Sequence, residues 1–182
     1  MTLKILWGIT GSGDKIEDII HIMLKLREKY DLKVIVALSK NGEMVTRIYN
    51  VWDLLKSFDK VLVEKGPNEP WLVGPLQMGN YDVFIVCPAT ANTTAKIAHG
   101  IADSLISNCV AQSLKAKREV YIYPVDQKIG ETTTILPNGK KLTLTIRNID
   151  FENAKKLKIM KGINVIPKVE DIEEIIKKHL NE

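Results

Sequence analysis

The sequence predicts an α/β fold of three layers, with a doubly wound parallel sheet in the middle. Two observations carry this prediction. Short runs rich in β-branched residues alternate with helical patterns, and such alternation is typical of βαβ units. Several of these runs are apolar at every position, not at every second one, which indicates strands that helices cover on both faces.

Strands and helices alternate over the first two thirds of the chain. The predicted strands are Leu3–Ile9, Leu32–Leu38, Lys60–Glu64, Asp82–Cys87 and Glu119–Tyr123. The predicted helices are Ile16–Tyr30, Glu43–Phe58 and Ile101–Ala116. In each helix the apolar residues recur at intervals of three and four, so that they share one face.

A β-hairpin interrupts this alternation after residue 124. Thr132–Leu136 and Lys141–Ile146 flank Pro137-Asn138-Gly139, and an Asn-Gly pair accepts the positive φ angles of a tight turn. We therefore expect a C-terminal hairpin insertion at about residues 131–147.

The remaining residues continue the α/β pattern. A helix is expected from about Asp150 to Gly162, then a strand over Ile163–Ile166 and a last helix over Pro167–Leu180, because Pro suits the first turn of a helix. No linker or repeat separates these parts, so we predict one domain that spans residues 1–182.

Composition and charge exclude several classes of protein. The chain has 182 residues, 45% of them hydrophobic, which is enough to bury a core without disulfides or metals. No apolar run approaches the roughly 20 residues that span a bilayer and no signal-peptide pattern opens the chain, so we expect a cytoplasmic protein with no membrane partner. The net charge of +4 is spread through the sequence, without the basic stripe of nucleic-acid binders. Cys87 and Cys109 lack metal-ligand spacing and are interpreted as buried thiols, so no metal site is expected.

A glycine-rich turn follows the first predicted strand. It reads Gly8-Ile9-Thr10-Gly11-Ser12-Gly13-Asp14, and such a turn brings a ligand close to backbone N–H groups at a helix start. It is neither a P-loop, because Asp14 separates Gly13 from Lys15, nor a dinucleotide fingerprint, because the glycine spacing differs. The residues alone allow either a phosphate cradle or a plain tight turn.

Two more strand ends carry polar residues, and ligands of open α/β sheets bind beyond the carboxyl ends of strands. After the second strand, Ser39, Lys40 and Asn41 offer a hydroxyl, a cation and an amide to a phosphate. A helix cap followed by a turn explains Ser39 and Asn41 equally well. After the fourth strand, the segment Cys87–Thr94 (CPATANTT) combines small residues with hydrogen-bonding ones.

Two sequence blocks resemble a known superfamily. Pro88–Thr93 (PATANT) resembles the PASANT motif of the flavoproteins that include the peptidyl-cysteine and phosphopantothenoylcysteine decarboxylases. Gly100–Leu105 (GIADSL) is similar to the block that follows it there, and Gly8–Gly13 to the first loop. The resemblance covers about residues 1–125. It implies a flavodoxin-like fold that binds FMN and is often trimeric, with the flavin at subunit interfaces.

Carried over by position, the resemblance implies a set of cofactor-binding residues. The phosphate and ribityl end of FMN would contact Gly11, Ser12, Gly13 and Ser39. The flavin ring would lie against Thr90, Asn92, Thr93, Ala102, Asp103, Ser104 and Leu105. The predicted set is completed by Thr10, Asn41, Pro88 and Ala89. No catalytic residue is assigned.

Departures from the decarboxylase pattern indicate another branch. The segment Leu76–Tyr81 lacks the histidine that decarboxylases place before the fourth strand, and Tyr123–Lys128 replaces their clamp of Pro, Met and Asn. The Arg- and Glu-rich segment of the prenyl-flavin synthases is also missing. The whole chain, notably Trp7–Lys15, Ser39–Arg47 and Tyr121–Thr134, most closely resembles archaeoflavoproteins.

This resemblance implies an archaeal FMN protein that accepts electrons from ferredoxin and passes them to oxidoreductases. The alternatives are an FMN-dependent dihydromethanopterin reductase, a relative of the flavin-dependent cysteine decarboxylases, or a binding module without redox function.

Three features stay open at this stage. Trp71 follows Pro67-Asn68-Glu69-Pro70 in what reads as a loop, from which it can stack on flavin or on a neighbouring subunit. His99 has no obvious carboxylate partner, which argues against catalysis. Lys155, Lys156 and Lys158 form either a solvated helix face or a docking patch for an acidic ferredoxin.

Overall fold

A six-stranded parallel sheet lies at the centre of the computed structural model, which describes residues 2–181. Its strands are β1 (Leu3–Ile9), β2 (Leu32–Leu38), β3 (Lys60–Val63), β4 (Val83–Ala89), β5 (Val120–Pro124) and β8 (Ile163–Val165). Their order is β3-β2-β1-β4-β5-β8, and all neighbouring pairs are parallel. The chain changes its direction of winding between β1 and β4, where doubly wound sheets bind their ligands. The predicted fold class is confirmed.

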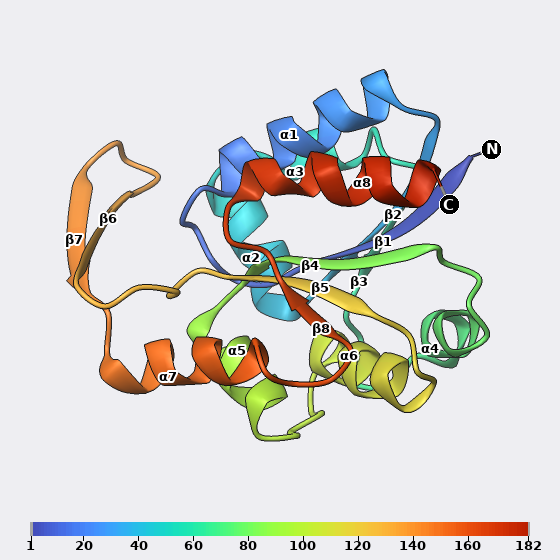
Figure 1. The fold of residues 1–182 in the computed structure, drawn as a ribbon. Helices are drawn as coiled ribbons and strands as arrows, with labels where there is room; N and C mark the ends of the chain where they lie inside the picture. Colours follow the sequence, from blue (N-terminus) through green and yellow to red (C-terminus); the bar gives the residue numbers. More distant parts are fainter. Residues whose placement is uncertain (1, 182) are drawn as a thin grey trace.

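Helices cover both faces of the sheet (Figure 1). The upper layer in that view contains α1 (Ile16–Lys29), α3 (Trp52–Leu55) and α8 (Ile172–Leu180). The lower layer contains α4 (Pro70–Gln77), α5 (Ala91–Ala98), α6 (Leu105–Lys115) and α7 (Asn148–Leu157). Helix α2 (Lys40–Ile48) begins two residues after β2, and a 3-10 turn, η1 (Val169–Asp171), leads into α8.

The core consists of two apolar clusters, one on each face of the sheet. Strand β1 contributes to both, because Trp7 packs with the residues of α1 and α8, whereas Leu6 packs with those of α5 and α6. The indole N–H of Trp7 donates to the carbonyl of Cys87 at 2.8 Å, which satisfies its one polar group inside the core. Strands buried on both faces are what their uninterrupted apolar sequence predicts.

The helix boundaries differ from the prediction in several places. The expected helix Glu43–Phe58 is divided into α2 and α3, because Asn50 takes a left-handed φ of 57° that no helix accommodates. Helix α6 begins at Leu105 instead of Ile101, since Ser104 and its capping box fix the start. The last helix begins at Ile172, after η1, instead of at Pro167. Helices α4 and α5 were not expected at all.

The predicted hairpin is present and projects away from the sheet (Figure 1). Strands β6 (Glu131–Ile135) and β7 (Lys141–Thr145) pair in antiparallel fashion, and Gly139 has the positive φ, 78°, that the turn requires. Every residue of β7 is exposed. The Tyr49 hydroxyl donates to the carbonyl of Ile135 at 3.1 Å and so connects the hairpin to the end of α2.

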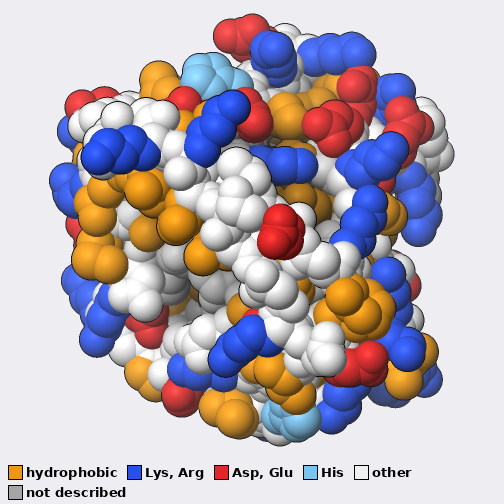
Figure 2. Space-filling view, turned by 90° about the vertical axis from the view of Figure 1, so that its left-hand side faces the viewer, with side chains coloured by type: hydrophobic (Ala, Val, Ile, Leu, Met, Phe, Trp, Pro, Cys, Tyr) orange, Lys and Arg blue, Asp and Glu red, His pale blue; other side chains and the backbone are white. Residues whose placement is uncertain are grey.

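The surface charges are mixed (Figure 2) and both cysteines are buried. Figure 2 shows Lys and Arg side chains interspersed with Asp and Glu on the side that carries the hairpin. Cys87 and Cys109 are buried free thiols, and burial raises the pKa of Cys109 to about 12. Across residues 2–181, no group of three or more His, Cys, Asp or Glu side chains is arranged to hold a metal ion. The helices of this same part of the chain are too short or too polar to cross a membrane.

Candidate functional site

Thr10 joins the ends of β1 and β4 at the point where the winding reverses. Its side chain is buried, with 1% of the residue exposed. The hydroxyl donates to the carbonyl of Pro88 at 2.8 Å and accepts the N–H of Thr90 at 2.9 Å. The N–H of Thr10 donates to the same Pro88 carbonyl at 3.2 Å. Thr10 and Pro88, both predicted cofactor-binding residues, therefore hold two loops of the site side by side.

The glycine-rich turn packs tightly against α2, and its role as a phosphate cradle stays a prediction. A Cβ on Gly11 would lie 2.6 Å from the Cβ of Asn41, and a Cβ on Gly13 would overlap the end of the Tyr49 side chain. Gly11 thus lets the turn pack closely against the start of α2. Within residues 2–181 the N–H groups of Gly11 and Gly13 have no hydrogen-bond acceptor, so both can bind an anion.

After β2, Ser39 has a structural role, whereas Asn41 has no hydrogen-bond partner among the described residues. Ser39 caps α2, since its hydroxyl accepts the N–H of Gly42 at 3.0 Å, and its own N–H donates to the carbonyl of Ile9 at 3.0 Å. The helix-cap interpretation of Ser39 is confirmed. Asn41 is exposed, and neither its N–H nor its carboxamide has a partner in the described part of the chain.

The PATANT segment forms the start of α5, which the sequence prediction missed. Thr90 caps the helix by accepting the N–H of Thr93 at 3.1 Å, and Thr93 is itself largely buried. Asn92 is exposed, and among residues 2–181 its carboxamide and its N–H are unpaired. Ala89 is fully buried in β4 and brings only its backbone to the site.

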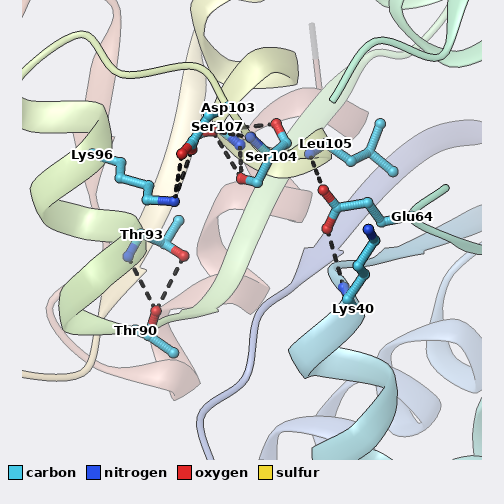
Figure 3. A network of polar contacts seen from close by, with 9 residues as sticks. All are labelled: Lys40, Glu64, Thr90, Thr93, Lys96, Asp103, Ser104, Leu105 and Ser107. Atoms are coloured by element: carbon cyan, nitrogen blue, oxygen red, sulfur yellow. Dashed lines mark hydrogen bonds and ion pairs between the residues drawn. The ribbon is translucent and has the colours of Figure 1, made fainter. Parts of the chain in front are cut away.

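Most polar groups of the second motif block, Gly100–Leu105, make hydrogen bonds or ion pairs with other residues of the chain (Figure 3). Asp103 forms an ion pair with Lys96 at 2.8 Å, and this hydrogen bond lowers the pKa of the Asp103 carboxyl. Ser104 caps α6, and its N–H donates to the Ser107 hydroxyl at 3.1 Å. The N–H of Leu105 donates to a carboxylate at 2.9 Å. The half-buried Ala102 precedes these residues without a polar side chain.

That carboxylate belongs to Glu64, a residue that the sequence analysis did not select. Its Oε1 accepts the N–H of Leu105 at 2.9 Å and its Oε2 accepts the N–H of Lys40 at 3.1 Å (Figure 3). Its own N–H donates to the carbonyl of Leu38 at 2.9 Å. A single carboxylate after a strand carries no sequence signal, because its contacts depend on which strands become neighbours.

The two open candidates have partners outside the motif blocks. The Nε2 of His99 lies 2.9 Å from Oδ1 of the buried Asn153, so this side chain connects α5 to α7. Trp71 lies in the first turn of α4, not in a loop, and its indole N–H donates to Glu69 at 3.1 Å. The residue is 66% exposed, and its contact with flavin or a neighbouring subunit stays a prediction.

A hollow of about 400 Å³ lies between the hairpin and the start of α1. Its lining includes Gly13, Asp14, Tyr49 and Thr134. Burial raises the pKa of the Asp14 carboxyl, partly offset by Lys15 and by a hydrogen bond with Thr134. The hollow therefore adjoins the glycine-rich turn and has polar groups on its walls.

Known proteins similar to this chain include one of very similar length. An uncharacterized protein of Methanocaldococcus jannaschii is 55% identical over 179 residues, which are 98% of this chain and 96% of that protein. A dihydromethanopterin reductase (acceptor) of the same organism is 37% identical over 161 residues, 82% of this chain. This chain spans 65% of that relative's length, slightly less than two thirds.

Among solved structures, the FMN complex of Burkholderia xenovorans DmrB has a TM-score of 0.82 and 25% sequence identity. The alignment covers 98% of this chain and 96% of that one. The structure is described as a cubic protein cage for redox transfer.

The family assignment rests on a match over nearly the whole chain. The sequence profile of the Flavoprotein family matches residues 1–181, including the hairpin and the C-terminal helices that lie outside the two motif blocks. This match confirms the relationship that PATANT and GIADSL indicate. The chain belongs to the Flavoprotein family.

Proposed function

We propose that this chain binds FMN where β1, β2 and β4 end and that it transfers electrons. One observation carries the proposal: the unpaired polar groups of Gly11, Gly13, Asn41 and Asn92 lie in the glycine-rich turn and in the first turns of α2 and α5. Thr10 and the backbone of Ser39 tie these three segments together. Free N–H groups and amides suit a phosphate and a polar heterocycle. FMN in the similar DmrB structure supports this choice of cofactor.

Within this proposal the residues divide the work of binding. The N–H groups of Gly11, Gly13 and Asn41 hold the phosphate, and the Asn92 carboxamide supplies one donor and one acceptor to the rest of the cofactor. Ser39, Thr90 and Ser104 keep their helices in place. FMN, when bound, supplies hydride and single-electron transfer, for which the protein provides binding and tuning. We also propose that residues 1–182 form a single domain.

As electron donor we propose a ferredoxin. Lys155, Lys156 and Lys158 are exposed on and just after α7, and a cluster of cations steers the approach of an acidic partner. We also propose a homo-oligomer, a trimer or a multiple of one, with FMN near subunit interfaces. The cage described for DmrB supports assembly. The cytoplasmic location stays a prediction.

A second candidate function is dihydromethanopterin reduction. The 37% identical relative with this activity favours it, and so does the hollow of about 400 Å³ beside Gly13 and Asp14, which offers room for a second flat ring system. A cysteine decarboxylase activity has less support, because no histidine precedes β4 in Leu76–Tyr81.

The test begins with an absorbance spectrum of the purified protein before and after FMN is added. Titration with reduced ferredoxin and then with dihydromethanopterin follows. We expect bound flavin that bleaches with ferredoxin. Bound flavin that ferredoxin does not reduce, but whose dithionite-reduced form is reoxidised by dihydromethanopterin, would support the reductase instead. A colourless protein that does not bind added FMN would overturn both the electron carrier and the reductase. The remaining hypothesis would be a binding module without redox function.

A further inference from the structure

We propose that Glu64 is a positioning residue that holds the α2 and α6 sides of the FMN site at a fixed separation. This inference rests on the proposed function. Glu64 lies directly after β3 and touches the start of two helices that follow different strands (Figure 3). Lys40 begins α2, between Ser39 and Asn41, and Leu105 begins α6, directly after Asp103 and Ser104.

The contact uses both oxygens of one carboxylate. The N–H of Leu105 donates to Oε1 at 2.9 Å and the N–H of Lys40 donates to Oε2 at 3.1 Å. Each N–H belongs to the first turn of a helix, where backbone donors lack partners within the helix and the helix dipole favours a negative charge. Charge-assisted bonds of this kind are stronger than neutral ones, so the Glu64 side chain fixes the starts of both α2 and α6.

Neutral substitutes for Glu64 cannot reproduce this bridge. The carboxamide of glutamine has one acceptor oxygen and an NH₂ group that only donates. In Glu64→Gln one of the two backbone N–H groups therefore faces another donor and loses its bond. The helix start that carries that N–H, in α2 or α6, is then free to shift by a small amount. Asn41 shifts with α2, or Asp103 with α6.

The rest of the fold does not depend on this bridge. The backbone N–H of residue 64 donates to Leu38, and the Asn108 carboxamide donates to the carbonyl of Pro67 at 2.8 Å, so the loop after β3 stays attached at two other points. Ser39 and Ser104 continue to cap their helices. We therefore expect the Glu64 variants to fold.

The first experiment compares Glu64→Gln with Glu43→Gln. Glu43 lies on α2 and its side chain pairs with Arg47 of the same helix at 2.8 Å, so Glu43→Gln changes the charge equally but leaves the bridge intact. We expect FMN to bind Glu64→Gln at least tenfold more weakly than the wild type, and Glu43→Gln within twofold of it. The visible circular dichroism of bound flavin should change only in Glu64→Gln.

The second experiment removes the N–H that the carboxylate accepts and keeps the carboxylate. Lys40 is the first residue of α2, where proline is favourable, and Ser39 before it has φ −65° and ψ 162°, which suits a residue before proline. Lys40→Pro is compared with Lys40→Ala, which also loses the ammonium group but keeps the N–H. We expect Lys40→Pro to bind FMN at least threefold more weakly than Lys40→Ala. Its effect should not add to that of Glu64→Gln.

The outcomes separate this inference from the proposed function. A wild-type protein that does not bind FMN overturns the proposed function. If the wild type binds FMN and Glu64→Gln binds it equally tightly, the role of Glu64 is overturned and the proposed function stands. Amide hydrogen exchange on the apoproteins gives an independent readout, because Lys40 or Leu105 should exchange faster in Glu64→Gln. Unchanged exchange at both amides, or equal affinities of Lys40→Pro and Lys40→Ala, also contradicts the bridge.

Discussion

Side chains that are alike in chemistry have different roles at the carboxyl edge of this sheet. The hydroxyls of Thr10, Ser39 and Thr90 bond to backbone groups and hold the loops together. The carboxamides of Asn41 and Asn92 have no partner within residues 2–181. Sequence analysis selected all five, because hydroxyls and amides after strands all suit a ligand. It could not separate the two groups, since the separation depends on which loops meet in space.

This division predicts a loss of binding without a loss of stability at Asn92. In Asn92→Ala, we expect the dissociation constant for FMN to rise about tenfold, which corresponds to about 1.4 kcal/mol, the magnitude of a typical net hydrogen bond. The melting temperature of the apoprotein should stay the same, because the side chain is exposed. Fluorescence titration and a thermal melt measure the two quantities. A lower melting temperature with unchanged affinity would remove Asn92 from the site.

Thr10 should behave in the opposite way. Thr10→Val keeps the shape of the side chain but removes the hydroxyl, which leaves the partly buried N–H of Thr90 without its acceptor. We expect the free energy of unfolding to fall by about 1–3 kcal/mol, measured by urea denaturation of the apoprotein. Unaltered stability would mean that the β1 and β4 loops are held together by other contacts.

At the scale of whole elements, burial made the strands predictable and the short helices hard to predict. The bounds of β1 and β2 agree with the prediction at both ends, because strands covered on both faces are apolar throughout. Helix α4 contains Gly74 and Pro75, which sequence rules count against a helix. It forms nevertheless because Leu72 and Leu76 are buried in the lower cluster. Here tertiary packing overrides local propensity, and no local pattern reports it.

The hairpin is an element that the sheet does not need for its own stability. The N–H of Ile146 donates to the carbonyl of Gly130 at 2.9 Å, so the two ends of the hairpin lie close together. When residues 131–145 are deleted and Gly130 is joined to Ile146, we expect cooperative unfolding to persist, while assembly or partner docking changes. Circular dichroism melts test the fold, and light scattering with ferredoxin reduction kinetics tests the rest. An unaltered oligomer with normal kinetics would contradict this role.

At the scale of the whole molecule, the Glu173 carboxylate makes stability depend on pH. Glu173 on α8 accepts hydrogen bonds from Lys29 at 2.6 Å and from the Tyr30 hydroxyl at 2.7 Å, which lower its pKa from 4.5 to about 2. Because the folded-state pKa is below the unfolded-state one, this contribution is fully present above about pH 4.5 and is lost as the pH falls to about 2. Urea denaturation at several pH values should show less acid sensitivity in Glu173→Gln. Identical pH profiles would contradict the linkage.

The bonds that build the proposed cofactor site join distant parts of the polypeptide. Thr10 meets Thr90 across 80 positions, and Glu64 meets Leu105 across 41. During synthesis on the ribosome, the glycine-rich turn is made early but has no partner until β4 and α6 have emerged. These contacts therefore cannot form before β4 and α6 have been made, since long-range contacts form late. In the proposed function, FMN accordingly binds only after most of the chain has been synthesised.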